Sequence, residues 1–216
     1  MNPFSNDADH ELFDVMAVRD CDPADWEIKA ENIAAIAFFL QTAALLEQLT
    51  IDPNTSTPFL LSGLQLPKRL QDTFPLLSEM WFRIPTDDTR EEVLNDILQT
   101  FDNIPQSNVL KSIGLVIELK MHMPVVHDSN TCLASAKRFW TRFASTLALS
   151  EAFPSLETVR PTVHLRLYDY MNEPYQCHAA EEHVIRDQFM DMFVESFATL
   201  KQDRPSVNVY WKVSFD

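Results

Sequence analysis

Acidic side chains recur at the points where predicted strands of this chain end. They are Asp52, Asp87, Asp88, Asp128, Asp169 and Glu173, with His127 beside Asp128. The carboxyl ends of parallel strands meet at one edge of a sheet, where open α/β proteins bind ligands. A row of oxygen ligands there would suit Mg²⁺ and a metal-assisted hydrolase or transferase. The alternative is that these carboxylates cap helices, because the loops that carry them precede helices.

Aromatic and cationic side chains occupy alternate positions of the predicted strands. The predicted binding residues are Trp81, Arg83, Lys120, His122, His164, Arg166, Tyr168, Tyr210 and Lys212, and Glu118 and Tyr170 share their face. Trp, Tyr and Arg dominate binding hot spots because they combine large rigid contacts with directional hydrogen bonds. The alternative is that long amphipathic side chains simply cover an exposed sheet. We expect a non-enzymatic protein-interaction module that binds an acidic protein segment on this face.

Histidine and cysteine spacing predicts neither a metal site nor a nucleophile. His178 and His183 are five residues apart, which places them about 140° apart around a helix. Acidic residues in the first turn of a helix explain this segment better. Cys132 would be activated near a helix start, but beyond His127 the sequence fixes no orienting group for it. We expect no catalytic residue, no metal and no cofactor, although the sequence does not exclude an enzyme.

Composition excludes several classes of protein. The 216 residues contain two glycines, Gly63 and Gly114, so the glycine-rich loops of dinucleotide and phosphate sites are absent. The formal net charge of −15 opposes binding to nucleic acid or an anionic membrane. The most apolar stretch, 33–46, is too short to span a bilayer.

Cysteine usage and the first residues predict an intracellular protein, cytoplasmic or nuclear. Cys21, Cys132 and Cys177 are odd in number and form no C-x-x-C pair, which favours reduced thiols. Residues 1–14 are acidic and lack the cationic and apolar regions of a signal peptide.

The apolar pattern divides the chain into repeated helix–strand units. We expect an acidic, loosely ordered lead-in over residues 1–28 and a single α/β repeat domain over 29–216. Helices are predicted over 31–46 and 66–73, on a stripe from Val93 to Phe101, and near 131–150 and 180–200; strands are predicted near 49–51, 80–84, 115–123, 163–167 and 207–215. The last helix is predicted to bury Val184, Phe189, Met192, Phe193 and Phe197.

Strand alternation selects the architecture. Crossover helices make neighbouring strands parallel. A doubly wound sheet would bury both faces of each strand and give continuous apolar runs. These strands alternate, so the fold class is α/β with repeated helix–strand units forming a one-sided, mostly parallel sheet, a leucine-rich-repeat-like arc.

Three proline-led segments between a helix and a strand carry a family resemblance. They begin at Phe74-Pro75-Leu76-Leu77, Phe153-Pro154-Ser155-Leu156 and Arg204-Pro205-Ser206-Val207. They resemble the turn of irregular leucine-rich repeats, and the unequal units and acidic balance are similar to the repeat regions of fungal F-box-type proteins. The resemblance covers roughly residues 31–216 and implies an arc that binds another protein, in that family often a target of ubiquitin ligation. No F-box helix triplet is found.

The sequence does not determine what covers the edge of the last predicted strand. The chain finishes within a predicted strand, whereas a repeat arc normally needs a polar cap over its last core face. Two alternatives follow: the edge strand pairs with a second copy, or the chain is a fragment of a longer repeat protein.

Overall fold

A parallel β-sheet covered by helices organises the molecule. The computed structural model describes residues 14–15, 48–51, 62, 67–68, 76–86, 91–123, 129–169 and 171–215. Its strands are β1 (Asp14–Val15), β2 (Gln48–Ile51), β3 (Glu79–Thr86), β4 (Ser112–His122), β5 (Thr158–Tyr168), β6 (Asn208–Val209) and β7 (Lys212–Phe215). Its helices are α3 (Glu91–Asp102), α4 (Ser129–Ala148), α5 (Ala179–Ser196) and α6 (Ala198–Asp203).

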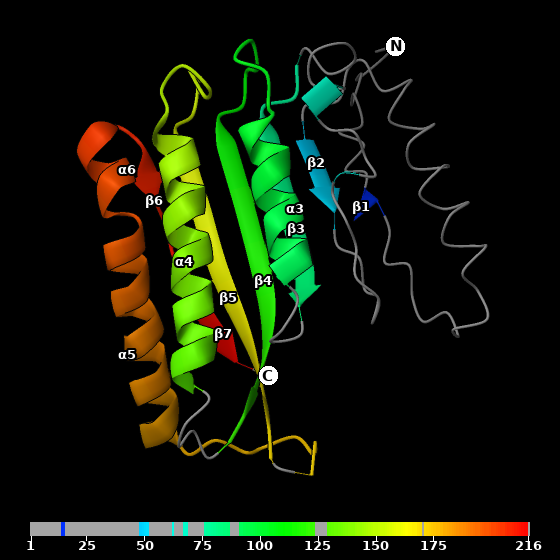
Figure 1. The fold of residues 1–216 in the computed structure, drawn as a ribbon, viewed down its shortest axis with the longest axis vertical. Coiled ribbons are helices and arrows are strands. Elements are labelled where there is room, and N and C mark those ends of the chain that lie inside the picture. Colours follow the sequence, from blue (N-terminus) through cyan, green and yellow to red (C-terminus); the bar gives the residue numbers. More distant parts are fainter. Residues whose placement is uncertain are drawn as a thin grey trace, which may run out of the picture.

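The strands follow one another across the sheet in chain order, and every pair of neighbours is parallel. Both β6 and β7 pair with β5 in a single register, Thr158 opposite Asn208 and Thr162 opposite Lys212, so they form one edge strand. Helices α3, α4, α5 and α6 lie on the same side of the sheet (Figure 1). For the described part of the chain, the α/β prediction with a one-sided parallel sheet is therefore confirmed.

The register of the strands also gives the length of each helix–strand repeat. Glu79 pairs with Gln48, Ser112 with Glu79, Thr158 with Ser112 and Asn208 with Thr158. Neighbouring strands are thus offset by 31, 33, 46 and 50 residues in turn. The longer units contain the longer helices, α4 with 20 residues and α5 with 18.

Alternating apolar side chains seal the core against the helices. Along β5, the odd-numbered residues from Val159 to Leu167, including Pro161, are buried, whereas the residues between them are half-buried or exposed. From the helix side, Trp140 of α4 packs against Phe193 of α5 with ring centroids 5.3 Å apart. Burial of this layer makes the largest favourable contribution to the free energy of folding, because it removes the apolar stripe of each helix from water.

Burial on β4 departs from the expected alternation. Ser112, Gly114 and Glu118 face away from the helices, yet they are buried. The cause is local: side chains of the neighbouring strands lie over Gly114 and Glu118, as described below.

One core prediction is wrong. Val184 of α5 is 56% exposed, whereas its neighbour Ile185 is 6% exposed and lies in the core. The helix packs through Ile185, Phe189, Met192 and Phe193, which follow one another at helical spacing. Val184 lies one residue, about 100°, away from that stripe.

Several predictions lie outside the described residues. They are the helix over 31–46, most of the helix over 66–73 and all of the lead-in over 1–28 except β1, which pairs with β2. In the described part of the chain, no helix is long and apolar enough to cross a membrane.

Candidate functional site

The sheet presents a face that the described helices do not cover. We call it the open face: the side chains of β3, β4, β5 and the edge strand that point away from those helices. Its members include Glu79, Trp81, Arg83, Gly114, Val116, Glu118, Lys120, His122, Arg160, Thr162, His164, Arg166, Tyr168, Tyr210, Lys212 and Ser214. All nine binding residues predicted from sequence lie on it, and Tyr170 lies outside the described residues.

Trp81 lies flat over the backbone of Gly114. The two residues are opposite each other on β3 and β4. A Cβ atom on Gly114 would lie 2.2 Å from Cε3 of the indole, closer than any van der Waals contact, so no larger residue fits beneath the ring. Glycine is therefore required here for close approach rather than for an unusual backbone angle.

Arg160 lies next to Gly114 on the other side from Trp81, so the three residues form a row across the strands. Its strand β5 pairs with β4 so that Gly114 is opposite Arg160, and the guanidinium carbon lies 5.2 Å from the centroid of the Trp81 ring. A cation over an indole face is attracted by the ring quadrupole. Tyr210, 59% exposed, continues the row, because its amide N–H donates to the carbonyl of Val159. We call Trp81, Arg160 and Tyr210 the aromatic row.

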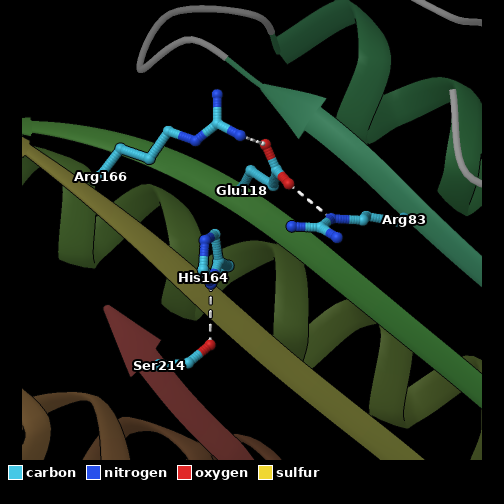
Figure 2. A network of polar contacts seen from close by, with 5 residues as sticks. All are labelled: Arg83, Glu118, His164, Arg166 and Ser214. Carbon is cyan, nitrogen blue, oxygen red and sulfur yellow. Dashed lines mark hydrogen bonds and ion pairs between the residues drawn. The ribbon is translucent and has the colours of Figure 1, made fainter. Parts of the chain in front are cut away.

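Glu118 joins three strands on the same face. Its Oε1 accepts from Nε of Arg83 on β3 at 2.5 Å, and its Oε2 pairs with Nη2 of Arg166 on β5 at 3.1 Å (Figure 2). Glu118 itself is only 7% exposed. A buried carboxylate with two charge-assisted contacts holds both guanidinium groups in fixed positions. We call these three residues the arginine clamp.

His164 extends the clamp toward the edge strand. On β5 it lies opposite Glu118 of β4 and Ser214 of β7. Its Nδ1 is 2.9 Å from Oγ of Ser214, and Figure 2 shows this contact beside the clamp.

The remaining predicted residues lie near the carboxyl end of the strands. Lys120 is opposite Arg166, and His122 is opposite Tyr168, with ring centroids 6.2 Å apart. Nδ1 of His122 is 3.2 Å from the backbone oxygen of Asp169. Lys212 is exposed on the edge strand, two residues after Tyr210.

Sequence reasoning missed two members of this site. The apolar alternation predicts this strand only from Val163 onward, so Arg160 lies outside the predicted strand. The part of Gly114 is visible only once β3 and β4 are in register. The one sequence signal was the isolation of a glycine within an apolar strand, which indicates a close approach of another group.

The alternative site, the carboxylates at strand ends, is described only in part. Asp52, Asp87, Asp88, His127 and Asp128 lie outside the described residues, as does the side chain of Cys132. Oδ1 of Asp169 accepts from the amides of Met171 and Glu173 at 2.7 and 2.9 Å, so this carboxylate organises its own loop. Among described residues, no group of three His, Cys, Asp or Glu side chains is placed to hold a metal ion.

The histidine segment begins a helix, as expected. Glu181, in the first turn of α5, accepts from the amide of His178 at 3.1 Å. Cys177 is a free thiol in this segment. Loss of solvation raises the pKa of this thiol, and the neighbouring Glu181 and Glu182 raise it further. The thiol is therefore held in its protonated, unreactive form.

Searches against protein-family models, curated proteins and solved structures found no match for this chain.

Proposed function

We propose that this chain is a non-enzymatic protein-interaction module and that its open face binds an acidic segment of another protein. The observation that carries the proposal is the charge of the sheet face that the described helices leave uncovered. Five cations lie on the described part of it, Arg83, Lys120, Arg160, Arg166 and Lys212, against the two acids Glu79 and Glu118. The whole chain has the opposite balance, with a formal net charge of −15.

The arrangement favours recognition over simple solvation of a sheet. The arginine clamp and the contact between Arg160 and Trp81 hold large side chains in place before any partner arrives, which lowers the entropy cost of binding. Complementary potential also steers an acidic partner toward this face and repels basic ones.

Three features of the fold support the resemblance to leucine-rich-repeat arcs. The strand order follows the chain, the neighbouring strands are parallel and the described helices cover one face. In this proposal, as in such arcs, the binding surface is the strand face. An intracellular location belongs to the same proposal, supported by the free thiol of Cys177.

Site-specific photocrosslinking tests the proposal. A benzoylphenylalanine in place of Thr162, at the centre of the open face, is irradiated in a cell lysate, and Ser145 on the exposed side of α4 serves as the control position. We expect crosslinks from position 162 alone, to peptides rich in Asp and Glu. They should disappear in the variant Arg160→Glu/Tyr210→Ala.

A matched variant controls for charge and apolar exposure. Arg138→Glu/Leu149→Ala makes the same two kinds of change at exposed positions on the helix side. Crosslinks that survive Arg160→Glu/Tyr210→Ala, or that join position 162 to peptides without acidic residues, would show that the open face does not bind acidic segments.

A further inference from the structure

Within the described residues, the outer edge of β7 has backbone groups that no other strand pairs with. The amides of Asn208 and Tyr210 donate to carbonyls of Glu157 and Val159, so even-numbered residues of the edge strand turn their N–H groups toward β5. Because the backbone alternates, Trp211, Val213 and Phe215 turn theirs outward. Among the described strands, none pairs with this outer edge. Such a row of N–H and C=O groups is a template for an added strand.

A groove runs beside this edge. It has a volume of about 860 Å³ and touches every residue of β7, together with the loop Pro174–Cys177 and the first turns of α5. The apolar part of its lining includes Leu167, Val213 and Phe215. Arg186 of α5 stacks on Phe215, with 5.3 Å between the guanidinium carbon and the ring centroid, and is paired with Glu182. The groove therefore has room beside the strand and an apolar wall on the helix side.

Charge differs between the two sides of the edge strand. On the helix side, Arg186 is neutralised by Glu182. On the open-face side, Lys212 lines the groove and has no acidic partner within 4 Å among the described residues. An added strand would therefore meet an apolar wall with one set of alternate side chains and a cation with the other set.

We propose that an extended peptide segment of a partner protein binds this groove by adding a strand to the outer edge of β7. Its side chains alternate between apolar residues, directed toward Phe215 and the helix side, and acidic residues, directed toward Lys212. Backbone hydrogen bonds supply affinity, and the alternating side chains supply specificity. A second copy of this chain fits less well, because two chains of net charge −15 repel each other. This binding differs from that of the open face, although Lys212 belongs to both surfaces.

The test uses the full chain and a defined peptide, acetyl-Val-Glu-Val-Glu-Val-Glu-Val-amide, titrated while the backbone amides are followed by NMR. We expect shifts centred on Trp211, Val213 and Phe215. Lys212→Glu should raise Kd by roughly fivefold, the size of one exposed ion pair. Arg160→Glu alters the open face but not the groove, so it should leave the Kd of the peptide unchanged. Binding to the groove can therefore be tested separately from binding to the open face.

Two methylated peptides decide whether the backbone pairs. In a parallel arrangement the glutamate amides face β7, and in an antiparallel one the valine amides do. N-methylation of one set should therefore abolish binding while N-methylation of the other preserves it. The proposal is overturned if both methylated peptides bind as well as the parent, if the amides of Val213 and Phe215 do not shift, or if sedimentation shows a dimer that Phe215→Ala dissociates.

Discussion

Single residues on the open face are constrained by their neighbours across the sheet. Gly114 supports the ring of Trp81, and Arg160 covers that ring from the next strand. Glu118 in turn fixes the ends of Arg83 and Arg166. Each side chain thus depends on the strand beside it, which explains why small changes here should have large structural effects.

Gly114→Ala tests this dependence. Its Cβ would clash with the indole, so the ring must leave its position, and we expect a loss of about 1–3 kcal/mol in the free energy of unfolding. Urea denaturation followed by circular dichroism measures it. In the double variant Gly114→Ala/Trp81→Ala the clash is absent, so the two losses should be clearly less than additive. Additive losses would mean that the alanine is accommodated without moving the ring.

Elements are joined in this fold by buried polar side chains as well as by the apolar core. Arg204 follows α6 and is buried, and it donates to the carbonyls of Leu147, at the end of α4, and Leu156, before β5. It thereby satisfies a carbonyl in the last turn of α4 that has no partner within the helix. Loss of solvation lowers the pKa of this guanidinium, which nevertheless stays charged.

Replacing Arg204 measures the strength of that link. Arg204→Met keeps the volume but leaves two carbonyls without their donor, and we expect a loss of about 1.5–3 kcal/mol in the free energy of unfolding. Arg142→Met is the matched control, because it removes an exposed ion pair with Asp102 and should cost less than about 1 kcal/mol. Equal losses for the two variants would contradict a linking role for Arg204.

The apolar pattern of the sequence predicts most elements because burial on one side imposes the period. It locates α4 within two residues and β4 within three at each end, whereas β5 begins at Thr158, five residues before the predicted start. It fails at Val184 because Val184 and Ile185 are adjacent apolar residues, and only packing against α4 decides which one is buried.

The site was harder to predict for a related reason. Alternation assigns side chains to a face, so Arg83, Glu118 and Arg166 were all expected there. Their contacts join residues that are 35 and 48 positions apart in the chain, so they depend on the register between strands, which local pattern does not determine. The same holds for the contact between Trp81 and Gly114.

The molecule as a whole combines strong negative charge with a locally positive surface. Its formal net charge of −15 makes like charges repel throughout the folded chain. The described part of the open face, by contrast, carries five cations against two acids. Salt screens both effects, because at 0.1 M it reduces interactions beyond about 10 Å.

Salt should therefore change stability and binding in opposite directions. Raising NaCl should increase Tm by a few degrees, because repulsion within the chain is screened, and should raise Kd severalfold for a blocked dodecapeptide of alternating Glu and Ser. Thermal denaturation and calorimetric titration measure the two. In Arg160→Glu/Tyr210→Ala we expect the same rise in Tm without peptide binding. A Kd that does not respond to salt would contradict electrostatic recognition.

The position of Trp81 gives the molecule an optical reporter of its own. Trp140 is fully buried in the core, and Trp211 lies at the edge strand with the Lys201 ammonium 4.8 Å from its ring centroid. Trp81 alone among these three indoles lies on the open face, under the charge of Arg160. A ligand that draws this guanidinium away changes the electric field at the indole. The wavelength of the fluorescence maximum of Trp81 should therefore shift. Occupancy of the face can thus be read in unlabelled protein.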